Sequence, residues 1–270
     1  MDARDRIRAA AMVAAVLAPP LAAQQLPGLL EESRLLPGSC SGLNGEALAM
    51  EAGRAVFGDR YEHINFIFSG LAVVFEPSGT DWVERAVLAP NDGASGDRFG
   101  FDVALSGDTV VVGATQDDDI GTDSGSAYVF TGGGTSWTQE AKLLPSNGAP
   151  QEWFVATVAV HGDTAAVGAR GPVGGTGSVY VFTRSGTAWT EQAVLTTGVA
   201  DDGFGGAVTL SGDTLLAGAA NGDGPALGSG TALVFVRSGT TWAQQATLTA
   251  SNGMRSEEHT SELQSRPHIS

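Results

Sequence analysis

D-R-F-G-F-D-V-A-L-S-G-D-T-V-V-V-G-A-T-Q-D-D-D-I-G-T-D-S-G-S-A-Y-V-F-T-G-G-G-T-S-W-T-Q-E-A-K-L-L, residues Asp97 to Leu144, is the stretch that decides the fold. Altered copies of it run from Trp153 to Leu195 and from Gly203 to Leu248. Tryptophans recur at matching places, 55, 52 and 53 residues apart (Trp82, Trp137, Trp189 and Trp242). A period near fifty residues is typical of propeller blades or of helical arrays, and the pattern inside the unit decides between them.

Inside the unit, short apolar runs alternate with tight turn signals. Phe101 to Leu105 and Thr109 to Gly113 are separated by Ser-Gly-Asp, which predicts a two-residue hairpin turn. Ser126 to Phe130 and Ser136 to Leu143 are joined by Thr-Gly-Gly-Gly, again short enough only for a hairpin. No long window shows helical apolar spacing. Each unit therefore predicts four antiparallel strands, which must stack on neighbouring sheets to bury their faces, so we expect an all-β chain folded as a β-propeller.

The repeats divide the chain into four expected blades. Residues 44–90 form a degenerate first blade that lacks the Phe-Gly opening, and 91–145, 146–197 and 198–250 form three clear ones. Propellers usually close with more blades than this, so we expect an incomplete ring. The open reading frame is expected to have continued into further blades.

The two ends differ from the repeats. Residues 1–23 resemble a signal peptide, since Arg4, Arg6 and Arg8 precede an apolar segment, and we expect an exported protein, extracellular, on the cell surface or periplasmic. Residues 24–43 are expected to be a linker. Residues 251–270 are interpreted as a non-native tail, because Arg255 onward resembles a translated sequencing adapter. No run is long and apolar enough to predict a transmembrane span.

Strand parity predicts two unlike faces. The turns between first and second strands, and between third and fourth, share one face and are all tight. The opposite face then receives the long loops, and it is where binding is expected. These loops are residues 90–97, 115–125, 146–152, 170–176, 197–202 and 220–228.

The chain is acidic, with a formal net charge of −16, which disfavours nucleic acid as a partner. Many of the acids fall on or beside the long loops: Asp92, Asp97, Asp117, Asp118, Asp119, Asp123, Glu152, Asp201, Asp202 and Asp223. Such a face could attract a cation or a basic partner. The alternative is a solvated acidic surface that keeps the protein soluble.

Two Phe-Gly pairs, each followed by a Gly-Ala pair, carry a family resemblance. Phe99-Gly100 with Gly113-Ala114, and Phe204-Gly205 with Gly218-Ala219, resemble the FG-GAP repeat of integrin α-subunit propellers and bacterial exported proteins. Phe154-Val155 with Gly168-Ala169 is a weaker copy. The resemblance implies an extracellular propeller used in adhesion or ligand binding.

Calcium is the one cofactor that the sequence suggests. Calcium-binding members of this family carry an Asp-x-Asp-x-Asp-Gly loop between the first two strands, where this chain has only a tight turn. Asp108, Asp163 and Asp213 are therefore predicted to form turns. Asp117, Asp119 and Asp123 in a single acidic loop could offer oxygens to calcium, and a solvated acidic loop is the alternative.

No arrangement of residues points to catalysis, because the few histidines pair with no nucleophile or metal-ligand set. The sequence predicts a non-enzymatic propeller module that binds an unknown protein or glycan on its long-loop face, as in cell-surface adhesion. One alternative is the propeller portion of a secreted hydrolase or lyase whose catalytic residues lie in missing sequence. A second is a purely structural array.

Overall fold

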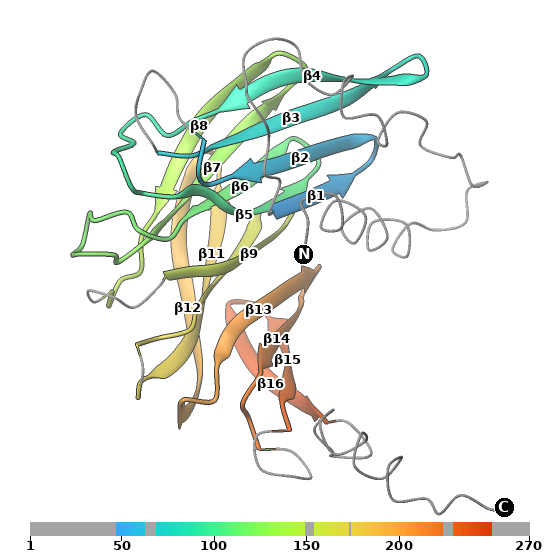
Figure 1. Ribbon diagram of the computed structural model, residues 1–270. Coiled ribbons are helices and arrows are strands. Elements are labelled where there is room, and N and C mark those ends of the chain that lie inside the picture. Colours follow the sequence, from blue (N-terminus) through green and yellow to red (C-terminus); the bar gives the residue numbers. More distant parts are fainter. Residues whose placement is uncertain (1–46, 63–68, 149–153, 173, 224–228, 250–270) are drawn as a thin grey trace, which may run out of the picture.

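The computed structural model describes residues 47–62, 69–148, 154–172, 174–223 and 229–249. These residues form sixteen strands in four antiparallel four-stranded sheets and contain no helix, which confirms the expected all-β propeller fold (Figure 1). We call the sheets blades 1 to 4 in chain order.

Each blade contains four consecutive strands, paired in chain order. Blade 1 has β1 (Ala47–Glu51), β2 (Arg54–Asp59), β3 (Leu71–Ser78) and β4 (Asp81–Leu88). Blade 2 has β5 (Phe99–Ser106), β6 (Thr109–Ala114), β7 (Ser126–Gly133) and β8 (Ser136–Leu143). Blade 3 has β9 (Phe154–His161), β10 (Thr164–Ala169), β11 (Thr176–Ser185) and β12 (Ala188–Ala200). Blade 4 has β13 (Phe204–Ser211), β14 (Thr214–Ala219), β15 (Thr231–Ser238) and β16 (Thr241–Leu248).

In blades 2, 3 and 4 the first strand packs against the preceding blade. β5 contacts β1 and β2, β9 contacts β5 and β6, and β13 contacts β9 and β10. The blades thus follow one another around an axis lined by first strands. Blades 1 and 4 lie at the two ends of the series, and the ring they begin is not closed (Figure 1).

Three hydrophobic clusters lie between neighbouring blades. A single blade would expose these apolar side chains to water, so the blades stabilise one another by stacking. The phenylalanine that opens blades 2, 3 and 4 is at the centre of each cluster and is fully buried (Phe99, Phe154 and Phe204). Phe99 contacts Tyr128 and Phe130 edge to face, with ring centroids 5.5 and 5.8 Å apart. Phe154 repeats this geometry in blade 3 with Tyr180 and Phe182, at 5.3 and 6.5 Å.

The glycine after the phenylalanine allows neighbouring backbones to touch. A Cβ on Gly58 of blade 1 would lie 2.2 Å from the carbonyl oxygen of Gly100, and one on Gly168 of blade 3 would lie 2.0 Å from that of Gly205. Gly100 and Gly205 also have φ angles of 88° and 79°, which favour glycine. Both glycines of each pair are therefore required by the blade-to-blade contact.

Val155 stands where the other two clear copies have the glycine after the opening phenylalanine, at the contact between blades 2 and 3. Its φ angle is 78°, a left-handed conformation that is costly for a β-branched residue. Its Cγ1 occupies the space where a Cβ on Gly113 would lie. The valine thus fills the gap that Gly113 leaves, and this packing offsets part of the backbone strain.

Every turn on one face of the array has two residues, as the hairpin signals predict. Asp108, Asp163 and Asp213 lie in these turns and bind arginine. Arg184 bonds Asp163 Oδ1 at 2.7 Å and lies over Trp189 at 5.3 Å, and Arg237 repeats this with Asp213 and Trp242. Each arginine also donates to a threonine of the preceding blade, Thr109 or Thr164, so the group links two blades.

At the contact of blades 1 and 2 the arginine belongs to the preceding blade instead of the blade that carries the turn aspartate and the tryptophan. Blade 2 has Gly132 where blade 3 has Arg184. Arg54 of blade 1 instead reaches Asp108 Oδ1 at 3.1 Å and lies over Trp137 at 5.1 Å. The same charge therefore occupies the same place, although it is supplied by a different strand.

Three strands are longer in the structure than the sequence predicted. β5 begins at Phe99 instead of Phe101, because the opening phenylalanine already pairs with Ala114. Gly132 and Gly133 belong to β7, so the turn that follows is Gly134-Thr135. β12 extends to Ala200, where it pairs with Thr176, so most of the predicted loop 197–202 is strand.

The predicted signal peptide (1–23), the predicted linker (24–43) and the predicted non-native tail (251–270) lie outside the described residues. Within the described part of the chain, no helix is long and apolar enough to cross a membrane.

The partly buried carboxylate of Asp102 couples blades 2 and 3 and allows a testable prediction. Asp102 Oδ2 accepts a 2.7 Å hydrogen bond from the Val158 N–H, and burial raises the pKa of Asp102 above its ordinary 3.8. A raised pKa in the folded state means that ionisation costs stability above about pH 3.8, and that this cost disappears below it. Asp102→Asn keeps an acceptor without the charge, so its melting temperature is expected to exceed that of the parent chain at pH 7 and to match it near pH 3. Thermal unfolding at both pH values checks this, and an equal difference at both would contradict it.

Candidate functional site

The long loops lie together, opposite the two-residue turns. In blade 2 the Gln116 N–H donates to the Asp97 carbonyl at 3.1 Å, and in blade 4 the Asn221 N–H donates to that of Asp202 at 2.8 Å. The loop that enters a blade therefore contacts the loop between its second and third strands. We call this surface the long-loop face.

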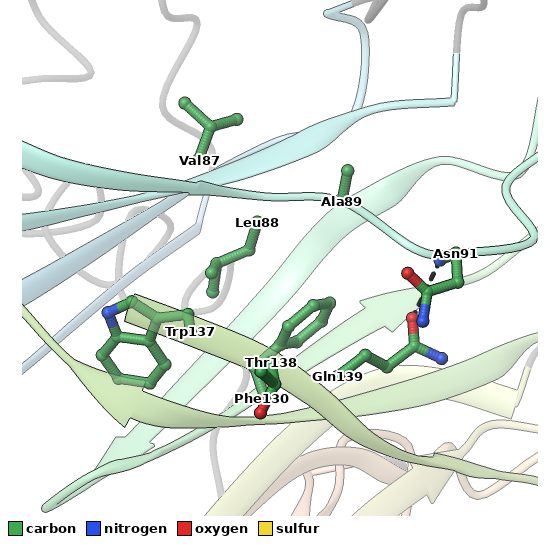
Figure 2. Close-up of a pocket in the computed structure, with 8 residues that line it drawn as sticks. All are labelled: Val87, Leu88, Ala89, Asn91, Phe130, Trp137, Thr138 and Gln139. Carbon is green, nitrogen blue, oxygen red and sulfur yellow. Dashed lines mark hydrogen bonds between the residues drawn. The ribbon is translucent and has the colours of Figure 1, made fainter. Parts of the chain in front are cut away.

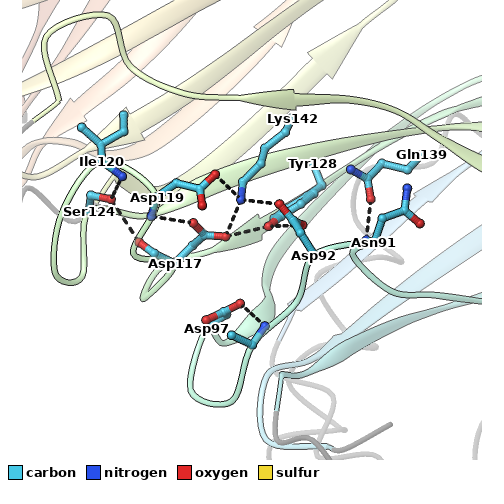
Figure 3. Close-up of polar contacts among 11 residues, drawn as sticks. Asn91, Asp92, Asp97, Asp117, Asp119, Ile120, Ser124, Tyr128, Gln139 and Lys142 are labelled. Carbon is cyan, nitrogen blue, oxygen red and sulfur yellow. Dashed lines mark hydrogen bonds and ion pairs between the residues drawn. The ribbon is translucent and has the colours of Figure 1, made fainter. Parts of the chain in front are cut away.

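A cluster on the long-loop face of blade 2 is centred on the ammonium group of Lys142, in β8. Its Nζ lies 2.8 Å from Asp92, 2.9 Å from Asp117 and 2.6 Å from Asp119 (Figure 3). Tyr128 from β7 completes the cluster, with its hydroxyl 2.6 Å from Asp117 Oδ2 and 3.0 Å from Asp92 Oδ1. The Lys142 ammonium also lies 5.0 Å from the Tyr128 ring centroid.

Burial and hydrogen bonding have opposite effects on the pKa values in this Lys142 cluster. The side chains of Lys142 and Asp117 are 14% and 4% exposed, whereas Asp92 and Asp119 are each 48% exposed. Burial alone would lower the pKa of Lys142, but hydrogen bonds to Asp119, Asp92 and Asp117 outweigh it and raise the pKa. Burial opposes ionisation of Asp92 too, yet bonds from Lys142 and Tyr128 lower its pKa. The lysine is therefore charged, and it ties two loops to the blade.

The structure brings together two of the three predicted calcium ligands. Asp117 and Asp119 share Lys142, and the Asp119 N–H donates to Asp117 Oδ1 at 3.1 Å. Asp123 lies apart, with a φ of 54° and its N–H bonded to Asp118 Oδ1 at 2.7 Å. Among the described residues, no group of three or more His, Cys, Asp or Glu side chains has an arrangement that could hold a metal ion. The ammonium occupies the place a cation would take, and calcium binding at this loop stays a prediction.

Sequence reasoning missed Lys142, Asp92 and Tyr128 as partners of the acidic loop. Lys142 is the only lysine in the chain, and the matching positions in the other blades carry Val87, Val194 and Thr247. A single lysine in the one unit that carries Asp-Asp-Asp was the signal that could have found the pairing.

A second feature is a groove of about 320 Å³ between β4 and β8, the outer strands of blades 1 and 2 (Figure 2). Its lining residues are Val87, Leu88, Ala89, Asn91, Phe130, Trp137, Thr138 and Gln139. Leu88 points toward Phe130 and Trp137, and the Asn91 N–H donates to Gln139 Oε1 at 2.8 Å. Leu88, Phe130 and Trp137 belong to the hydrophobic cluster between blades 1 and 2, so this part of the groove follows from how the blades stack.

A solved structure shares the fold. A protein from Lactobacillus plantarum aligns with a TM-score of 0.51 at 16% identity, covering 76% of this chain and 56% of that one. Sqt1 from Saccharomyces cerevisiae aligns at 0.44 and 11% identity (76% and 48% covered), and TolB from Acinetobacter baumannii at 0.36 and 10% identity (65% and 37% covered). The chain thus spans little more than half of the first of these structures. No curated protein matches it in sequence.

The FG-GAP repeat family matches at residues 82–130, 137–182 and 189–235, together more than half of the chain. Each match begins at a tryptophan in the last strand of one blade and ends in the third strand of the next, at Phe130, Phe182 and Phe235. The repeat therefore contains the Phe-Gly contact by which one blade packs on another. With three consecutive matches on a series of four-stranded blades, the chain belongs to the FG-GAP repeat family.

Proposed function

We propose that the chain is an exported, non-catalytic propeller module whose long-loop face binds a protein or glycan partner, as in cell-surface adhesion. Export is supported by the basic and apolar pattern of residues 1–23 and by the family, which is typical of extracellular and periplasmic proteins. Secretion of the chain with and without residues 1–23 tests that part.

The observation that carries the proposal is the contrast between the two faces. One face has only two-residue turns, while the other carries the loops and a set of exposed acids, Asp92, Asp118, Asp119, Asp201 and Asp223. Loops held on a rigid scaffold are common sites of recognition. An acidic face of this kind favours a partner with basic groups.

The Lys142 cluster supports the same role. It fixes residues of two long loops, Asp92 and Asp117 to Asp119, against β7 and β8. Loops that are already ordered lose less conformational entropy when a partner binds. The long-loop face of blade 2 is thus a preorganised surface.

A matched pair of substitutions in blade 2 tests which face binds. Thr122 lies on the long-loop face and Thr135 in the Gly134-Thr135 turn on the opposite face, and both are exposed. Thr122→Lys is expected to weaken binding to basic extracellular proteins by about fivefold at low salt, or about 1 kcal/mol, because it adds a repelling charge. Thr135→Lys is expected to leave affinity unchanged.

The measurement is binding to a panel of immobilised basic extracellular proteins and glycans, followed by titration of the ligands found. Equal weakening by both variants would show that net charge and not the long-loop face governs binding. A panel without any ligand would contradict the proposal.

A further inference from the structure

The outward face of blade 4 exposes the positions that are buried in the other three blades. Leu88, Leu143 and Leu195 hold equivalent positions in the last strands of blades 1 to 3 and are 2%, 2% and 7% exposed, because the next blade covers them. Leu248 holds this position in blade 4 and is 50% exposed. Leu216 and Val234 are also partly exposed, although their counterparts in blades 1 to 3 are fully buried.

Polar groups on this face repeat the pattern. Thr109 and Thr164 are 3% exposed and accept hydrogen bonds from Arg184 and Arg237 of the following blade. Thr214 holds the same position in blade 4 and is exposed.

Hydrogen-bond acceptors in the last strands also bind the next blade in blades 2 and 3 but are exposed in blade 4. Glu140 and Gln192 each accept the indole N–H of the next blade's tryptophan, from Trp189 at 2.8 Å and Trp242 at 2.9 Å. Gln245 is their counterpart in blade 4 and is exposed. At the other contacts these acceptors bind the arginine and the tryptophan of the following blade. In blade 4 the equivalent acceptors, Thr214 and Gln245, are exposed on the outward face.

Gly218 completes the comparison. Its counterparts Gly58 and Gly168 contact the backbone of the next blade at the glycine after the opening phenylalanine. A Cβ on Gly218 would meet only Ala207, at 3.5 Å and beyond. The space that another Phe-Gly backbone would fill is therefore open.

We infer that the outward face of blade 4 is a docking surface for one further FG-GAP blade, which opens with Phe-Gly and carries the repeat's arginine and tryptophan. Its phenylalanine would lie against Leu216, Val234 and Leu248. Its arginine would donate to Thr214 and its indole N–H to Gln245. This surface is distinct from the long-loop face, and the inference does not depend on the proposed function.

A second copy of the described chain does not fit as the occupant. The opening phenylalanines of blades 2 to 4 are fully buried by the blade before each. The corresponding face of blade 1 carries Leu71, Val73 and Phe75, none more than 2% exposed. The occupant is therefore a blade additional to the four described.

Insertion of a second copy of residues 198–250 directly after Ala250 of the full chain tests the inference. This copy supplies all three docking residues, Phe204, Arg237 and Trp242. Amide hydrogen exchange of β14 to β16 is expected to slow at least tenfold relative to the parent chain. Gly218→Ala in the extended chain is expected to abolish this gain, whereas in the parent chain it is expected to leave exchange unchanged.

A copy of residues 91–145 inserted at the same place serves as a second donor, in case the first fails to fold. Protection with either copy that is sensitive to Gly218→Ala supports the inference. Absence of protection with both copies, or protection that is insensitive to Gly218→Ala, overturns it.

Discussion

Gly168→Ala is expected to destabilise the protein by about 3 kcal/mol, whereas Gly218→Ala changes the free energy of unfolding by less than about 0.5 kcal/mol. The two glycines hold the same position in blades 3 and 4. A Cβ on Gly168 would lie 2.0 Å from the Gly205 carbonyl oxygen, and a backbone group fixed between two sheets cannot move aside cheaply. Neither glycine has a positive φ, so backbone strain does not enter the difference. The Cβ on Gly168 would also lie 2.8 Å from Thr157 Cγ2 in its own blade, but a side chain moves aside more easily than a backbone carbonyl, so the difference measures mainly the blade contact.

Urea denaturation of both variants and the parent chain gives these free energies. Gly58→Ala is an independent repeat of the first change, at the contact of blades 1 and 2, where the Cβ would lie 2.2 Å from the Gly100 carbonyl oxygen. Similar small effects of Gly168→Ala and Gly218→Ala would show that blades 3 and 4 do not pack as described.

Lys142→Met is the other change with a large expected effect, a loss of about 3 kcal/mol of stability. The methionine keeps the apolar stem but removes the charge, and this leaves the buried Asp117 carboxylate beside Asp92 and Asp119 with no counter-ion. Thermal and urea unfolding at pH 7 measure the loss.

Two additions make this experiment specific. Lys142→Met combined with Asp117→Asn is expected to recover part of the stability, since the amide still accepts from Tyr128 and no buried charge is left unpaired. A double variant no more stable than Lys142→Met would contradict the role given to the ion pair. Calorimetry of the parent chain with millimolar calcium tests the prediction for Asp117, Asp119 and Asp123, and an absence of heat would remove it.

The fold could be predicted because it depends on local, repeated signals. Two-residue turns at Gly107-Asp108 and its copies, strand-length apolar runs and a fifty-residue period all indicate the same arrangement. The parity of the strands placed the long loops on one face, and contacts such as that between Asp97 and Gln116 agree with it.

What the sequence did not predict depends on contacts between blades. Arg54 and Arg184 occupy different strands yet place a guanidinium at equivalent sites, and only the packing of neighbouring sheets reveals this. Lys142 and Asp92 are fifty residues apart and meet because a loop and an outer strand end at the same face. The repeat alignment identifies the equivalent positions, but it does not indicate which side chain crosses from one blade to the next.

Hydroxyl-radical footprinting of the intact chain, read at four equivalent leucines, tests most directly whether each blade covers the apolar face of the one before it. The stacked array predicts that Leu88, Leu143 and Leu195 are protected and that Leu248 is readily oxidised. Equal reactivity of all four leucines would contradict the stacking of the blades.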